Sequence, residues 1–99
     1  MVYKQEKLAE AEKHFQYALV IKPDLLQPRL DLANVLYMQK KYNEAIEHFY
    51  EALRIDPKNA EAHNNLGVVF ANQRKINDAI NHFSEALRIN PRHTEAQNI

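Results

Sequence analysis

The stretch YNEAIEHFYEALRIDP, from Tyr42 to Pro57, recurs almost intact as INDAINHFSEALRINP, from Ile76 to Pro91. A looser copy, LAEAEKHFQYALVIKP, runs from Leu8 to Pro23. The prolines that close the three copies are residues 23, 57 and 91, so the copies are spaced 34 residues apart. A period of this length is typical of proteins that repeat one supersecondary unit. Four further positions keep the same spacing: Ala11, Ala45 and Ala79; Phe15, Phe49 and Phe83; Ala18, Ala52 and Ala86; Leu19, Leu53 and Leu87.

Each copy has the residue spacing of an amphipathic helix. Its apolar residues recur three and four positions apart, which places them on one stripe of a helix. Glu44 lies near the start of the middle copy and Arg54 near its end, where their charges oppose the helix dipole. Pro57 then ends the helix. In the middle copy the apolar stripe consists of Ala45, Ile46, Phe49, Ala52, Leu53 and Ile55.

A second amphipathic segment precedes each of these helices. Only two basic residues, Lys40 and Lys41 or Arg74 and Lys75, separate it from the helix that follows. So short a polar break predicts a tight turn between antiparallel helices. The sequence therefore predicts an all-α protein made of helical hairpins. The apolar residues of the preceding segments are Leu30, Leu32, Ala33 and Leu36 in one repeat and Leu66, Val69 and Phe70 in the next.

Small residues indicate where two helices approach each other closely. Gly67, in the first helix of a hairpin, is expected to face Ala79 in the second helix. The rings of Phe49 and Phe83 are expected to fill the space between neighbouring hairpins.

The composition excludes several kinds of function. The 99 residues include 13 Lys plus Arg and 13 Asp plus Glu, so no net charge favours nucleic acid or an anionic membrane as a partner. A single glycine leaves no phosphate-binding loop, and the absence of cysteine removes thiol nucleophiles and cysteine zinc sites. No apolar run has the length of a signal peptide or a membrane span, so no membrane contact is expected. No pattern identifies a compartment, and the cytoplasm is the default expectation.

The period resembles the tetratricopeptide repeat, or TPR, because Leu66 and Gly67 are adjacent, Phe70 is aromatic, Phe83 lies between two alanines, and Pro91 ends the unit. The resemblance implies an α-α solenoid in which hairpins stack as a right-handed superhelix. It covers residues 1–99 as a single region. Residues 1–25 are expected to form a partial repeat, residues 26–59 and 60–93 complete repeats, and residues 94–99 the start of a further one.

The chain departs from the family pattern at two places in each repeat. The family often has a large aromatic residue where this chain has Arg29 and His63. It also often has glycine in the turn between the helices, where this chain has Lys40 and Arg74. A non-glycine residue that adopts a positive φ there costs roughly 1 kcal/mol.

The resemblance implies a non-catalytic interaction scaffold that binds a peptide or helix of a partner protein. In this family the binding surface is a concave groove lined by the first helix of each hairpin. Asparagine suits such a groove, since its amide can both donate to and accept from a peptide backbone. By helical phase, the groove residues of this chain are Gln27, Leu30, Asp31, Asn34, Tyr37, Met38, Glu61, Asn64, Asn65, Val68 and Asn72.

Three functions are open at this point: a peptide-binding adaptor, a self-assembling scaffold, and the substrate-recruiting arm of a larger enzyme such as a protein glycosyltransferase. The TPR arrays of those glycosyltransferases carry groove asparagines, and Asn65 falls at the matching place, whereas Asp31 departs from that pattern. In the carboxylate clamp of co-chaperone TPR domains, the positions held here by Leu30, Glu95 and Ile99 are basic. We therefore expect no such clamp.

No catalytic residue, cofactor or metal is expected. His14, His48 and His82 follow the period, but hairpins stack about 10 Å apart, whereas a metal must lie about 2.1 Å from each ligating nitrogen. These histidines are therefore expected on the outer face of the second helices. Ser84 and Thr94 have no catalytic base in a recognisable motif, so no enzyme activity is expected.

Apolar residues near both ends of the sequence predict a homo-oligomer. A single hairpin cannot bury its apolar face alone, so an uncovered face favours contact with a second copy. The residues expected to be uncovered are Leu8, Ala11, Phe15 and Leu19 at one end and Ile80, Leu87 and Ile89 at the other.

Overall fold

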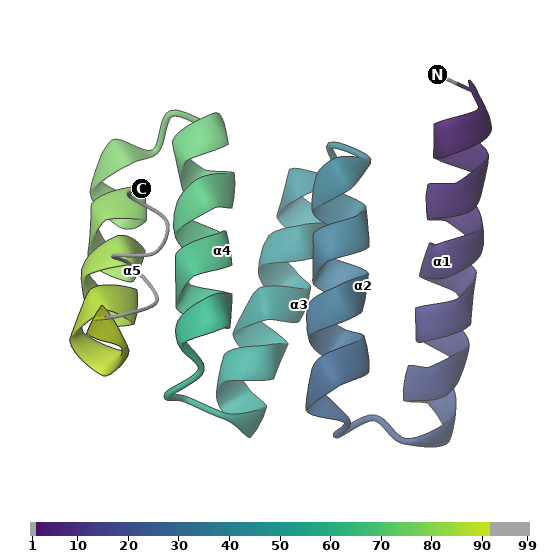
Figure 1. The fold of residues 1–99 in the computed structure, drawn as a ribbon, viewed down its shortest axis with the longest axis horizontal. Coiled ribbons are helices and arrows are strands. Elements are labelled where there is room, and N and C mark those ends of the chain that lie inside the picture. Colours follow the sequence, from purple (N-terminus) through teal and green to yellow (C-terminus); the bar gives the residue numbers. More distant parts are fainter. Residues whose placement is uncertain (1, 92–99) are drawn as a thin grey trace.

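The computed structural model describes residues 2–91, with side chains described from Gln5 onward. These residues form five α-helices and no strand, which confirms the all-α fold (Figure 1). The start of a further repeat that was expected at 94–99 lies outside the described residues. The helices are α1 (Val2–Ile21), α2 (Leu26–Met38), α3 (Tyr42–Ile55), α4 (Ala60–Asn72) and α5 (Ile76–Ile89).

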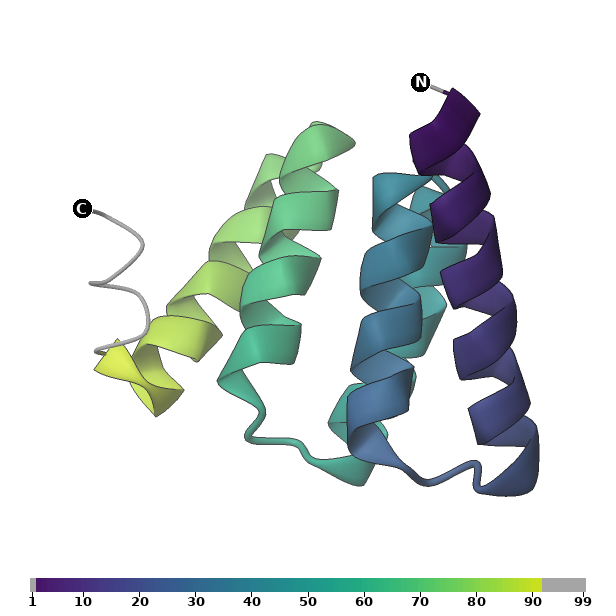
Figure 2. The same ribbon diagram turned by 45° about the vertical axis from the view of Figure 1, so that its right-hand side comes forward.

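The helices form a short solenoid of stacked hairpins. They stand side by side in sequence order, and α2 pairs with α3 as α4 pairs with α5 (Figure 1). Figure 2 shows α2 in front of α3 and α4 in front of α5. One face of the molecule is thus formed by α2 and α4, and the opposite face by α3 and α5. Helix α1 packs against α2, as α3 packs against α4.

The turns inside the two hairpins have the same backbone structure. Lys40 has a φ of 64° and Arg74 a φ of 62°, which is the left-handed region that favours glycine. The amide of Lys41 donates to the Leu36 carbonyl at 2.9 Å, and the amide of Lys40 donates to the Tyr37 carbonyl at 2.9 Å. This pair of hydrogen bonds is a Schellman motif, and it recurs 34 residues later. Both tight turns predicted from the basic pairs are therefore present.

Close packing inside the second hairpin depends on Gly67. A Cβ built on Gly67 would lie 2.6 Å from Cε1 of Phe83, far closer than two carbons can approach. The Phe83 ring therefore lies against α4 within its own hairpin, whereas the sequence predicted it in the space between hairpins. The ring can reach this place because glycine leaves room that even alanine would fill. Phe49, its counterpart in the first hairpin, is completely buried.

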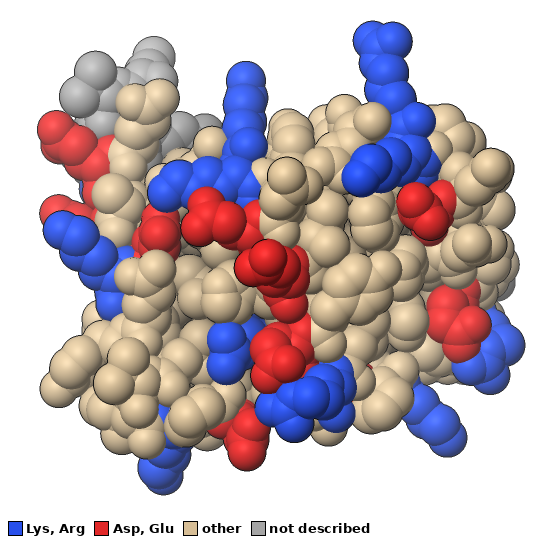
Figure 3. Space-filling model, turned by 180° about the vertical axis from the view of Figure 1, so that it is seen from behind, with Lys and Arg blue, Asp and Glu red and all other residues tan. Residues whose placement is uncertain are grey.

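The face formed by α3 and α5 carries charges of both signs. Acidic and basic side chains lie next to each other across it (Figure 3). Arg54 pairs with Glu51 at 2.9 Å, and Arg88 pairs with Glu85 one repeat later. The balanced net charge of the chain is thus also balanced locally on this face.

Within residues 2–91, none of the helices is long and apolar enough to cross a bilayer.

Candidate peptide-binding groove

A pocket of about 170 Å³ opens between α2 and α4; we call it the groove pocket. Its walls come from these two helices, and Phe49 of α3 contributes to it from below the surface as a fully buried residue. Five of the predicted groove residues line it. The complete lining is Asn34, Tyr37, Met38, Phe49, Asn65, Val68 and Val69.

Two asparagines face each other across the groove pocket. Asn65 Nδ2 donates a hydrogen bond to Asn34 Oδ1 over 3.1 Å, which links α4 to α2. An asparagine amide has two N–H donors and an oxygen that can accept twice. The pair therefore retains both donors of Asn34 and the acceptor of Asn65 after bonding to itself. It can offer donors and an acceptor to a peptide backbone laid across it.

Tyr37 is held in place at the side of the same pocket. Asn72 Nδ2 donates to the Tyr37 hydroxyl at 3.0 Å and to the Val68 carbonyl at 2.9 Å. The ring of Tyr37 also packs against that of Tyr42, with centroids 5.7 Å apart. Because both ends of the side chain are restrained, the aromatic wall of the pocket is preorganised.

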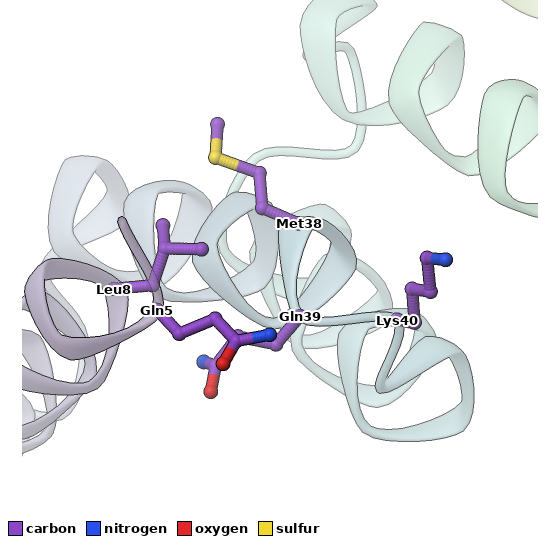
Figure 4. Close-up of a pocket in the computed structure, with 5 residues that line it drawn as sticks. All are labelled: Gln5, Leu8, Met38, Gln39 and Lys40. Atoms are coloured by element: carbon purple, nitrogen blue, oxygen red, sulfur yellow. The ribbon is translucent and has the colours of Figure 1, made fainter. Parts of the chain in front are cut away.

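A second pocket, of about 330 Å³, continues the groove toward α1; we call it the end pocket. Met38, which is 59% exposed, lines both pockets and therefore joins them. Figure 4 shows Leu8 of α1 and Met38 of α2 pointing to the same side. Flexible methionines adapt to different apolar side chains, so this junction suits a variable ligand. The end pocket is lined by Gln5, Leu8, Met38, Gln39 and Lys40.

A polar cluster fixes α1 beside the end pocket. Gln39 Nε2 donates to Glu12 Oε1 at 2.7 Å, and Lys41 Nζ lies 3.3 Å from the same oxygen. The hydrogen bond from Gln39, with the charge and hydrogen bond of Lys41, lowers the pKa of the Glu12 carboxyl. Glu12 is thus an anion that ties α1 to the α2–α3 turn.

Two predicted groove residues are buried elsewhere. Leu30 is 1% exposed and belongs to the hydrophobic core with Leu19 of α1, and Asn64 is 5% exposed. Neither can present its side chain to a bound peptide, so their assignment to the groove is corrected. Helical phase could not predict this burial, because it depends on how successive hairpins stack.

Three further predicted residues, Gln27, Asp31 and Glu61, line neither pocket. Gln27 Nε2 donates to Asp31 Oδ1 at 3.0 Å, so these two side chains bond to each other. Glu61 is half-buried in the first turn of α4. Two lining residues, Phe49 and Val69, were missed because their spacing identified them only as core. They are core residues that also form the floor of the groove pocket.

Two of the three periodic histidines, His48 and His82, are less exposed than the sequence predicted, whereas His14 is exposed as expected. His82 is half-buried and stacks on Phe70 with centroids 5.6 Å apart, so the expected outer-face position is wrong for it. Its Nδ1 lies 3.1 Å from Nδ1 of His63, and its Nε2 lies 3.0 Å from the Tyr50 hydroxyl. Burial, followed by the neighbouring His63, lowers the pKa of His82.

His48, the counterpart of His82 one repeat earlier, is also half-buried rather than on the outer face. Arg29 Nη1 lies 3.0 Å from its Nδ1. Burial and the Arg29 charge lower the pKa of His48. In the described part of the chain, no three histidine, cysteine, aspartate or glutamate side chains converge as metal ligands.

Comparison with known protein families gives two matches. A model described as TPR repeat matches residues 33–74, and one described as tetratricopeptide repeat matches residues 60–93. Together they extend over more than half of the chain. A search of curated proteins gave no match.

Solved structures share the fold. A protein described as YrrB, a TPR protein with an unusual peptide-binding site, superimposes with a TM-score of 0.86 at 24% identity, covering 99% of this chain and 52% of its own. A structure described as MamA MSR-1 C2 gives 0.83 at 23% identity, with coverages of 93% and 52%. Another, described as MamA, gives 0.83 at 17% identity, with coverages of 94% and 54%. The chain thus spans about half the length of these structures.

Proposed function

This chain belongs to the tetratricopeptide repeat family, and from that premise we propose that its groove binds an extended segment of a partner protein. The ligand lies across α2 and α4, with its backbone on the asparagine pair and its side chains in the groove and end pockets. The function is that of an adaptor and involves no chemical step. A solved relative by fold, YrrB, is described as having a peptide-binding site, which supports this mode for the present chain.

The observation that carries the proposal is the bonded pair Asn34 and Asn65 above a partly apolar pocket. A pair that offers both donors and an acceptor matches the alternating N–H and C=O groups of an extended backbone. Among the residues with described side chains, none that lines the groove pocket is charged, and Lys40 is the one charged residue that lines the end pocket. Affinity then comes from hydrogen bonds and apolar contacts, and a peptide with terminal carboxylates gains little from charge.

Selection from a random peptide library displayed on phage tests this proposal. The wild-type chain is expected to enrich a consensus with apolar side chains, while an Asn34→Ala/Asn65→Ala variant loses recovery of the same phage. The matched control is Asn77→Ala/Asn81→Ala, which removes two exposed asparagines of α5 outside the groove. Equal recovery by the groove variant and the control would contradict the proposal.

A second candidate function, assembly of copies into a scaffold, is supported by exposed apolar side chains at both ends. The faces differ in part from those predicted, because Leu19 is buried and Leu8, Ala11 and Phe15 are half-buried. The stripe that contains them packs toward α2 and leaves another face of α1 uncovered. The exposed residues are Tyr17, Val20 and Ile21 on α1 and Ile76, Ile80 and Leu87 on α5; Ile89 is half-buried.

A further inference from the structure

The junction between the two hairpins is filled by a tyrosine. The Tyr50 ring of α3 lies edge-on to the His82 ring of α5, with centroids 5.7 Å apart. Its hydroxyl lies 3.0 Å from His82 Nε2. A phenol ring thus packs against a half-buried histidine between two successive repeats of this chain.

The same place one repeat earlier lacks its tyrosine. Gln16 occupies the position 34 residues before Tyr50, and its side chain bonds to Glu12 at 3.2 Å on its own helix. A pocket of about 270 Å³, which we call the side pocket, is open at this junction. It is lined by Gln16, Leu19, Val20, Arg29, Leu32 and His48.

The side pocket contains a histidine, His48, at the position that His82 has beside Tyr50 in the next repeat. Arginine is only a donor, so Arg29 donates to His48 Nδ1, and the proton of the neutral imidazole lies on Nε2. The corresponding Nε2 of His82 is the atom that meets the Tyr50 hydroxyl. A phenol oxygen can accept as well as donate, so it can accept from His48 Nε2.

A second polar group in the side pocket lacks a partner. Arg29 Nε is buried and makes no hydrogen bond within the described part of the chain. Both Arg29 Nε and His48 Nε2 carry N–H groups, so an occupant that brings an oxygen acceptor suits this pocket better than a hydrocarbon does.

The rim of the side pocket is also unlike its counterpart. In the next repeat, Glu51 and Arg54 form an ion pair on α3, the helix that carries Tyr50. The residues 34 positions earlier are Tyr17 and Val20, which are 68% and 79% exposed. An apolar rim beside an open pocket is typical of a surface that a partner covers.

We propose that the side pocket is a docking site for a tyrosine side chain of a partner protein. The ring lies where Tyr50 lies in the next repeat, and the hydroxyl oxygen accepts from His48 Nε2. The side pocket shares no lining residue with the groove or end pockets. Docking here is therefore independent of the peptide groove and adds a second contact point on the same scaffold.

The test is a titration with p-cresol, the side-chain analogue of tyrosine, followed by amide and imidazole NMR shifts. Saturable shifts are expected around Leu19, Leu32 and His48, with a Kd of about 1–10 mM, as suits so small a ligand. Toluene, which lacks the hydroxyl, is expected to bind at least about threefold more weakly, because it offers no acceptor to the N–H groups of Arg29 Nε and His48 Nε2.

Two variants make the result decisive. Gln16→Tyr supplies the missing ring from within the chain, so it is expected to abolish the p-cresol shifts and to raise the melting temperature. Ser84→Tyr adds the same ring at an exposed position of α5 outside the side pocket and is expected to retain binding. The proposal is overturned by an absence of saturable shifts in the wild type, by shifts that persist in Gln16→Tyr, or by toluene binding as tightly as p-cresol.

Discussion

Lys40 and Arg74 show how a single backbone position ends each groove-lining helix. Both have a left-handed φ, and both form the Schellman hydrogen bonds that stop α2 and α4. Both side chains are exposed, so replacing either residue by glycine removes no buried contact. The turn therefore forms, but with a small steric penalty that glycine at the same position would not have.

Replacement of Arg74 by glycine is expected to stabilise the protein. Glycine adopts a φ of 62° without the steric penalty of a Cβ, so the free energy of unfolding should rise by about 1 kcal/mol. Urea denaturation followed by circular dichroism measures this change. Arg74→Ala is the control, because it removes the same side chain but keeps the Cβ. A gain in the alanine variant equal to that in the glycine variant would show that φ is not the cause.

At the scale of helices, the junction between α3 and the second hairpin is held by a chain of three side chains. His63 Nε2 donates to the Pro57 carbonyl at 3.3 Å, so Nδ1 of neutral His63 is an acceptor. His82 Nδ1 then donates to it, and His82 Nε2 accepts from the Tyr50 hydroxyl. Every member is satisfied when both imidazoles are neutral. A proton added to His82 Nε2 would turn this atom into a donor, so it could no longer accept from the Tyr50 hydroxyl.

Acidification is therefore expected to weaken the junction. Burial lowers the pKa of His82, and also that of His48, below the ordinary value of 6.5. As the pH falls through about 6.5, the unfolded chain binds protons before the folded chain does, so the free energy of unfolding falls. This stability is complete above pH 6.5 and is lost as the pH drops toward the folded pKa. Asp78 and Glu85 oppose the shift at His82 but do not reverse it.

Thermal melts between about pH 7.5 and 5.5 measure this effect, since this range lies above the titration of ordinary carboxylates. The melting temperature of the wild type should fall with pH, and His82→Gln, which cannot take up a proton, should have a smaller slope. Adding His48→Gln should reduce the slope further. A wild-type melting temperature that does not change over this range would contradict a stabilising role for neutral His82 at this junction.

The sequence was sufficient to predict the helices, but not to predict which face of each helix is buried by a neighbouring helix. The period and the apolar spacing predicted α2 to α5 and their turns, because these depend on residues close in sequence. Leu30 and Asn64 were misplaced because their burial depends on how hairpins stack. Phe49 could not be predicted as a pocket residue, because residues of the pocket floor and residues of the hydrophobic core recur at the same spacing along a helix.

The histidine positions were misjudged for a related reason. Histidine is partly apolar, so a histidine that recurs once per repeat is compatible with a solvent-exposed face and with a contact between two hairpins. Only the stacked arrangement shows that His82 contacts Phe70 and Tyr50. Asn34 and Asn65, in contrast, line the groove pocket, and helical phase was enough to predict them as groove residues.

For the whole molecule, exposed apolar faces at α1 and α5 predict contact between copies. Sedimentation and light scattering should show a mass that rises with protein concentration. Tyr17→Glu/Val20→Arg installs on α1 the residues found one repeat later, so it should restore the monomer while leaving the helices intact. A wild-type chain that stays monomeric at about millimolar concentration would contradict this, since 1 mM corresponds to only about 4 kcal/mol of association free energy.

We propose that the face of α2 and α4 holds an extended peptide through Asn34 and Asn65. The most direct measurement is fluorescence anisotropy of a labelled peptide selected on the wild-type chain. Loss of two or more backbone hydrogen bonds, each contributing about 1 kcal/mol, should weaken binding by roughly 30-fold or more in Asn34→Ala/Asn65→Ala. Asn77→Ala/Asn81→Ala should bind within a factor of about two of the wild type, as surface substitutions outside a site do. An unchanged Kd in the groove variant, with its melting temperature preserved, would contradict the account.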